Sequence, residues 1–132
     1  MKEEAINSGA YGFGGPNPDL GQISFSFAGN CAVQNGTIKI PNCTQLTKTI
    51  RGIYLSVGTA PTGTSIIVDV NINSDSICFL KPTIPDGLTT GYVDEIQKPL
   101  WKHGDLLSVD IDQVGSTTSG ADLVISIVFL KG

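Results

Sequence analysis

Apolar and polar residues alternate with a period of two through most of this chain. The segment 23–28 alternates strictly, so that one isoleucine and two phenylalanines fall on the same face. The same alternation recurs in residues 65–73, 106–114 and 122–130. A period of two is typical of β-strands that bury one face. The chain is therefore predicted to be all-β.

Turn residues separate these apolar runs. The chain has 16 glycines and 7 prolines, spread along its length as punctuation, and Asn35-Gly36 is predicted to be a turn between two short strands. Turn signals that recur about every ten residues favour a two-sheet antiparallel β-sandwich of about eight short strands. The predicted strands cover residues 23–28, 31–33, 37–40, 50–57, 65–73, 76–80, 92–96, 106–114 and 122–130.

The last two strands are predicted to line the core. Their inward residues are Leu107, Val109, Ile111, Leu123, Ile125, Ile127 and Phe129. The intervening residues Val124, Val128 and Leu130 are apolar as well, so the last strand is predicted to be buried on both faces. Contact with another subunit would cover that second face.

Residues 1–22 differ from the rest and are predicted to form an extended, flexible arm ahead of a sandwich domain at 23–132. This segment is rich in Gly and Pro without any period, so it buries little surface. Tyr11 and Phe13 are its aromatic residues. They are either anchors that dock on a neighbouring surface or part of an ordinary N-terminus, and the sequence leaves both alternatives open.

Length, charge and cysteine content narrow the class of protein. The chain has 132 residues, a formal net charge of -4 and only 15% charged residues. Without a basic stripe or a long apolar stretch, we expect no nucleic-acid or membrane partner. The first residues lack the apolar core of a signal peptide, so we expect folding in a cytoplasm. Cys31, Cys43 and Cys78 are then expected to be buried, reduced thiols, with a Cys31–Cys43 bridge as an unsupported alternative.

Residues 69–75 resemble the first half of a calcium-binding loop. The sixth position is Ser74 instead of Gly and the twelfth is Leu80 instead of Glu, so the sharp turn and the bidentate ligand are both missing. Asp69, Asn71 and Asn73 are also the expected outward positions of an alternating strand. The strand is the simpler interpretation, and an irregular calcium site is the alternative.

Other polar residues offer little chemistry. Asp110 and Asp112 would lie side by side on one flat strand face, whereas paired catalytic carboxylates need a cleft that separates their pKa values. His103 is the only histidine, with no second histidine or cysteine at ligand spacing. We therefore expect no catalytic residues, no metal, no cofactor and no enzyme activity.

Two aromatic residues are candidates for contact with a glycan or a partner. Trp101 precedes a Gly-Asp turn, where it would either close one end of the core or form an exposed platform for a sugar ring. Tyr54 alternates with Ile53 and Leu55, which places its phenol on the outer surface of a sheet.

Two runs carry a resemblance to a known family. GIYLSVGTAPTGTSIIVDVN at residues 52–71 and, above all, VDIDQVGST at 109–117 resemble a module that recurs on the virions of tailed bacteriophages, in capsid-decorating proteins and in head or tail fibres. The resemblance covers about residues 50–130. It implies a jelly-roll-like sandwich on the virion exterior, commonly a homotrimer, and carries no catalytic residues with it.

These observations lead to two hypotheses. The first is a structural virion protein, a capsid decoration or head-fibre component that attaches to the major capsid protein or another virion protein. The attachment residues would be Tyr11, Phe13, Pro16 and Leu20. The alternative is a carbohydrate-binding module that adheres to host-surface glycans through Trp101, Tyr54 or the loops at 58–64 and 115–121.

Overall fold

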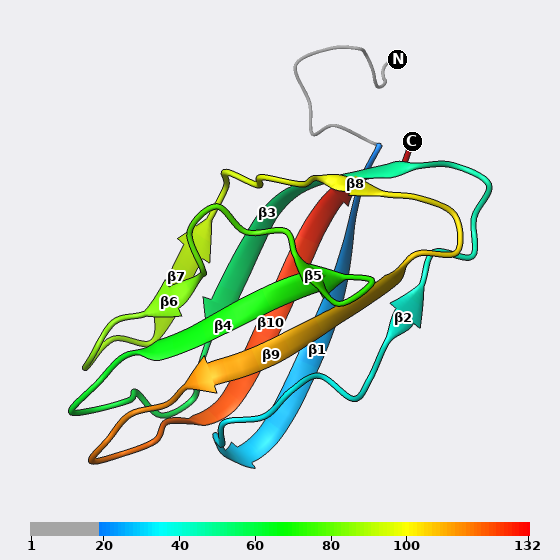
Figure 1. Ribbon diagram of the computed structural model, residues 1–132. Helices are drawn as coiled ribbons and strands as arrows, with labels where there is room; N and C mark the ends of the chain where they lie inside the picture. Colours follow the sequence, from blue (N-terminus) through cyan, green and yellow to red (C-terminus); the bar gives the residue numbers. More distant parts are fainter. Residues whose placement is uncertain (1–18) are drawn as a thin grey trace, which may run out of the picture.

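The chain folds into ten β-strands in a computed structural model that describes residues 19–132, and no helix occurs in that range (Figure 1). Predictions that concern residues 1–18 lie outside the described part. The strands are β1 (Leu20–Asn30), β2 (Ile40–Pro41), β3 (Lys48–Ser56), β4 (Ile66–Ile72), β5 (Asp75–Ser76), β6 (Thr83–Ile84), β7 (Thr90–Val93), β8 (Leu100–Trp101), β9 (Leu106–Gln113) and β10 (Ala121–Leu130).

The strands form two antiparallel sheets. Sheet A has the order β1-β10-β3-β7, with β8 also paired to β3, and sheet B has the order β2-β9-β4-β5, with β6 also paired to β4. Because β5 and β6 share one partner and β7 and β8 share another, the ten strands occupy eight positions. The first and last strands pair in one sheet, and the second and next-to-last pair in the other, which is a jelly-roll order. The predicted two-sheet antiparallel sandwich is confirmed.

Apolar side chains from the facing sides of the two sheets fill the space between them. Six of the seven residues predicted to line the core from the last two strands are at most 2% exposed, namely Leu107, Val109, Ile111, Leu123, Ile125 and Ile127. The seventh, Phe129, is half-buried and packs against the core edge. The period-two pattern therefore identified the core directly.

The predicted hairpin at Asn35-Gly36 is wrong. Gln34 pairs with Ile111 and Ile40 pairs with Leu107, so both flanks lie along the same strand, β9. The chain advances six residues from Gln34 to Ile40, whereas β9 advances only four from Leu107 to Ile111. The extra residues form a bulge in the sheet edge. A Cβ at Gly36 would lie 2.2 Å from the Val109 carbonyl oxygen, so the close approach of the bulge to β9 requires glycine here.

Other strand boundaries differ from the prediction as well, and β6 and β8 were not predicted. β1 begins at Leu20, three residues before the predicted start, so residues 20–22 belong to the sandwich and not to the arm. The expected strand at 76–80 is reduced to the end of β5, because the segment leaves the sheet after Ser76. The expected strand at 92–96 begins at Thr90 and ends at Val93.

The outer side of β10 is not buried within the described residues. Val124, Val128 and Leu130 are half-buried, and their outer side faces the surface of sheet A. The prediction that the last strand is covered on both faces is therefore not met by residues 19–132 alone.

Candidate functional site

The sandwich has two ends, which β10 connects (Figure 1). At the arm end, β1 begins and β10 finishes, and the Lys131 amide donates a hydrogen bond to the Asp19 carbonyl oxygen at 2.7 Å. At the loop end, three loops meet, formed by residues 58–64, 85–89 and 115–120. A strand of 10 residues separates these ends by about 30 Å.

The predicted attachment residues lie mostly outside the described range. Tyr11, Phe13 and Pro16 precede residue 19, so the structure does not place them. Leu20 is the first residue of β1 and pairs with Leu130 in β10. Its side chain is 39% exposed at the arm end, so it is accessible there.

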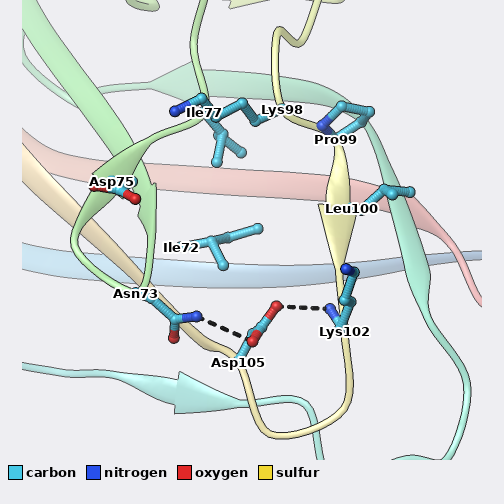
Figure 2. A pocket seen from close by; sticks show the side chains of 9 residues that line it. All are labelled: Ile72, Asn73, Asp75, Ile77, Lys98, Pro99, Leu100, Lys102 and Asp105. Atoms are coloured by element: carbon cyan, nitrogen blue, oxygen red, sulfur yellow. Dashed lines mark hydrogen bonds between the residues drawn. The ribbon is translucent and has the colours of Figure 1, made fainter.

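A pocket of about 470 Å³ opens at the arm end (Figure 2). The turn between β4 and β5 forms one side of the pocket, and the segment from Lys98 to Asp105 forms the other. Ile72 and Ile77 provide a buried apolar wall, and Leu100 is 51% exposed. The full lining is Ile72, Asn73, Asp75, Ile77, Lys98, Pro99, Leu100, Lys102 and Asp105.

Hydrogen bonds across the pocket hold its two sides together. The Asp105 carboxylate accepts a hydrogen bond from the Asn73 side-chain amide at 3.0 Å and another from the Lys102 backbone amide at 3.0 Å (Figure 2). Asn73 has a positive φ of 53°, which the β4–β5 turn requires, and its side-chain oxygen accepts from the Leu106 amide at 2.9 Å. The Asp105 carboxylate is therefore a structural acceptor, and Lys98 and Lys102 contribute the basic residues of the pocket lining.

Asn42 is a structural residue of the arm end that the sequence analysis missed. It is 2% exposed, and its side-chain amide donates to the carbonyl oxygens of Leu46 at 3.0 Å and Trp101 at 2.9 Å. These bonds fasten the loop after β2 to β8. His103 contacts the same loop, with its Nδ1 2.5 Å from the Thr44 carbonyl oxygen. Nothing in the spacing along the chain marked Asn42, because its bond to Trp101 joins segments 59 residues apart.

Trp101 does not form the exposed platform considered above. Its side chain is 3% exposed, and its indole N–H donates to the Asp105 carbonyl oxygen at 2.8 Å. Its ring meets the Phe129 ring edge to face, at 5.8 Å between centroids and 79° between planes. Trp101 thus closes the core at the arm end, and a sugar cannot stack on it.

Tyr54 lies on the outer face of sheet A, as its position in the alternation predicted. It is 46% exposed, and its ring stacks on that of Tyr92, which is 63% exposed, at 5.6 Å between centroids and 11° between planes. The two residues face each other across β3 and β7. Tyr92 was not singled out from the sequence, because the pairing of these strands is not readable from either segment alone. The pair forms a flat aromatic surface of the kind that contacts sugars or partner side chains.

The loops at 58–64 and 115–121, which the sequence analysis considered together, do contact each other. The Thr62 amide donates to the Thr118 carbonyl oxygen at 2.9 Å, and the Thr117 amide donates to the Thr62 carbonyl oxygen at 2.9 Å. The Gly63 amide donates to the Asp86 carboxylate at 3.2 Å, which connects a third loop to these two. The loop end is therefore a hydrogen-bonded unit that lies far from Trp101 and from the pocket.

The acidic residues of sheet B are not a row of solvated outward side chains. Asp69 is 7% exposed and Asn71 is 6% exposed. Asp69 accepts from the Ser76 hydroxyl at 2.6 Å, and Asp110 accepts from the Asn71 amide at 2.9 Å and from the Gly36 backbone amide at 2.6 Å. Among the oxygens of the calcium candidates, one of Asp69 thus accepts from Ser76, and that of Asn73 accepts from the Leu106 amide. No cluster of three potential metal-ligating side chains is found within residues 19–132.

The three cysteines are free thiols, and they do not share one environment. Cys31 and Cys78 are buried, whereas Cys43 is exposed, which corrects the expectation that all three are buried. Burial raises the pKa of the Cys78 thiol to about 11, and burial together with the nearby Asp122 carboxylate raises the pKa of Cys31. The two buried thiols are therefore held in the neutral, unreactive form at neutral pH.

Comparison with known proteins adds no family assignment. No family model matches the chain, and no curated protein matches it at a significant level. Residues 19–132 contain no helix that could span a membrane. The site must therefore be interpreted from its own geometry.

Proposed function

We propose that this protein is a structural component of the exterior of a tailed-bacteriophage virion, a capsid decoration or head-fibre protein, which attaches through its arm end. The observation that carries the proposal is the polarity of the sandwich. The segment 1–18 enters next to Asp19, at the end that also holds the pocket, whereas the interlocked loops lie about 30 Å away. Attachment at one end leaves the other end to face outward.

The chemistry of the two ends supports this orientation. The arm end combines the apolar wall of Ile72 and Ile77 and the exposed Leu100 with the Lys98 and Lys102 ammonium groups. Such a mixture suits a protein partner, because apolar contacts supply affinity and rim charges supply orientation. The loop end presents mainly Gly, Thr and Ser backbone and hydroxyl groups. The resemblance of residues 50–130 to virion-surface modules points to the same arrangement.

Assembly in many copies is part of the proposal. The partners are other copies of this chain and the major capsid protein or another virion protein. A short arm and a shallow pocket make a weak single contact, and repeated copies on a symmetric particle would strengthen it through avidity. The expected location is the virion, after synthesis in the host cytoplasm.

The test is reconstitution on particles assembled without this protein. We expect deletion of residues 1–18 to abolish attachment while the circular dichroism spectrum of the sandwich stays unchanged, because β1 begins only at Leu20. Full-length Tyr11→Ser/Phe13→Ser should weaken attachment in the same direction. Thr62→Ala at the loop end is the matched control and should attach normally. Full occupancy by the truncated protein would refute attachment through the arm.

One observation favours a second function, the binding of host glycans. The Tyr54–Tyr92 stack offers a flat aromatic surface, 46% and 63% exposed, on the outer face of sheet A. Aromatic surfaces of this kind contact the apolar face of a sugar ring. A glycan array should then show a ligand for the wild type that Tyr92→Ala loses. Absence of any wild-type ligand would reject this function and leave the first unaffected.

A further inference from the structure

The outer edge of β1 is unprotected within the described part of the chain. β1 has 11 residues and forms one boundary of sheet A, where β10 is its only neighbour among residues 19–132. Its sequence, LGQISFSFAGN, contains no charged residue and no proline. Long, neutral edges are rare in natural sheets, because unpaired backbone groups there attract a further strand.

Half of the backbone groups of β1 point away from sheet A. The hydrogen bond from the Lys131 amide to the Asp19 carbonyl oxygen marks that pair as hydrogen-bonded across the two strands. Since β1 and β10 stay in register from Leu20 to Phe27, the odd-numbered residues bond β10. The N–H and C=O groups of the even-numbered residues, among them Gln22, Ser24 and Ser26, therefore face outward in the plane of the sheet.

The other edges of the two sheets carry features that block such pairing. β2 contains Pro41 and adjoins the bulge at Gly36. β5, β6 and β8 have two residues each, and β7 has four. Short strands, prolines and bulges are the usual means of protecting an edge. Within residues 19–132, β1 is irregular only between Phe27 and Asn30, and its run from Leu20 to Phe27 is the edge segment that lacks these features.

We propose that β1 pairs antiparallel with β1 of a second copy of this chain, about a two-fold axis, so that the two A sheets become one continuous sheet. Self-pairing suits this strand because its apolar and polar positions alternate in the same way along either direction of the chain. In a register that preserves the two faces, Ile23, Phe25 and Phe27 meet one another on the core side, and Gln22, Ser24 and Ser26 meet on the outer side. Because the strand has no charges, no like charges oppose each other across the axis.

The partial exposure of the core side of β1 agrees with this partner. Phe25 is 5% exposed, whereas Ile23 and Phe27 are only half-buried and lie against the core from the edge. A second copy of β1 would place its own Ile23 and Phe27 beside them and extend the apolar layer across the axis. The contact is isologous, so it closes as a dimer and does not grow into a fibre.

Charge complementation tests the proposal directly. Ser24→Lys/Ser26→Lys and Ser24→Glu/Ser26→Glu each place like charges opposite one another in the face-preserving registers whose axis falls on residues 24 to 26. In sedimentation of the full chain, we expect the wild type to be dimeric and each variant to weaken dimerisation at least 100-fold. An equimolar mixture of the two variants should restore a heterodimer. Ser56→Lys, on the same outer face but in β3, is the control and should dimerise as the wild type does.

Several outcomes would overturn the inference. A wild-type monomer at all concentrations would mean that the edge is covered in another way, for instance by residues 1–18 of the same chain. A wild-type trimer whose mass the charged variants leave unchanged would place the subunit contact elsewhere and favour the three-fold assembly implied by the resemblance. Variants with the wild-type circular dichroism spectrum but no restoration on mixing would also contradict it. None of these results bears on attachment through the arm.

Discussion

The outer faces of the two sheets have similar alternating sequences and very different surroundings. On sheet B, residues 34–37 and 76–81 bond to the outward side chains, so that Asp69 is 7% exposed and Asn71 is 6% exposed. On sheet A, Tyr54 and Tyr92 remain 46% and 63% exposed. Sheet B thus uses its polar residues to hold its own loops, and sheet A leaves its outer face available to other molecules.

The largest difference between the faces should follow removal of the Asp110 carboxylate. Asp110→Ala leaves the Gly36 amide and the Asn71 side-chain amide without their acceptor in a partly buried site. We expect the free energy of unfolding in urea to fall by about 2–3 kcal/mol. Asp112→Ala is the matched control, since its partner Lys81 has a side chain that is 49% exposed, and should cost less than about 1 kcal/mol. Equal losses would show that the hydrogen bonds of Asp110 to the segments over sheet B stabilise the fold no more than an exposed ion pair does.

The Cys78 thiol lies near Asp69, in the segment 76–81 over sheet B, and its pKa allows a pH test of this segment. Burial raises the pKa of Cys78 to about 11 in the folded state, whereas the unfolded thiol ionises near its ordinary pKa. The contribution of the neutral thiol is complete below about pH 9 and is lost as the pH rises towards about 11, because the unfolded state releases the proton first. Urea unfolding between these pH values should show this decline, and Cys78→Ala should flatten it. A thiol reagent should modify Cys43 at once and Cys78 only on unfolding.

The smallest effect is expected on the open face. A double-mutant cycle of Tyr54→Ala and Tyr92→Ala should give a coupling free energy of about 0.5 kcal/mol, since the stacked rings are partly exposed. Each single variant should keep the wild-type fold by circular dichroism. A coupling of several kcal/mol would mean that sheet A depends on this pair for stability, and the contrast between the two faces would disappear.

Sequence alternation predicted the core and the fold class well, because burial of one strand face depends on local order along the chain. Ile125 and Ile127 were placed correctly for that reason alone. The Asn35-Gly36 hairpin was not, since the residues on both sides of it pair with β9, about 70 positions further along. Local turn chemistry could not reveal that shared partner.

The surface residues were predictable only in part. The position of Tyr54 on an outer face follows from period two, but its stacking partner Tyr92 depends on the pairing of β3 with β7. Trp101 was left open between core and surface, and its burial depends on Phe129 and on the Asp105 carbonyl oxygen. The burial of the outward residue Asp69 could not be predicted, because no local pattern shows that Ser76 and Lys81 fold back over it.

The adjacency of Asp19 and Lys131 also bears on how the sandwich responds to force. A molecule anchored at residue 19 and pulled at the loop end would be loaded lengthwise along β1 and β10. The ladder between these strands runs without interruption from Leu20 to Phe27, so its hydrogen bonds would be sheared together and would not be peeled one by one. The lengthwise direction is therefore the one in which we expect the sandwich to resist rupture best.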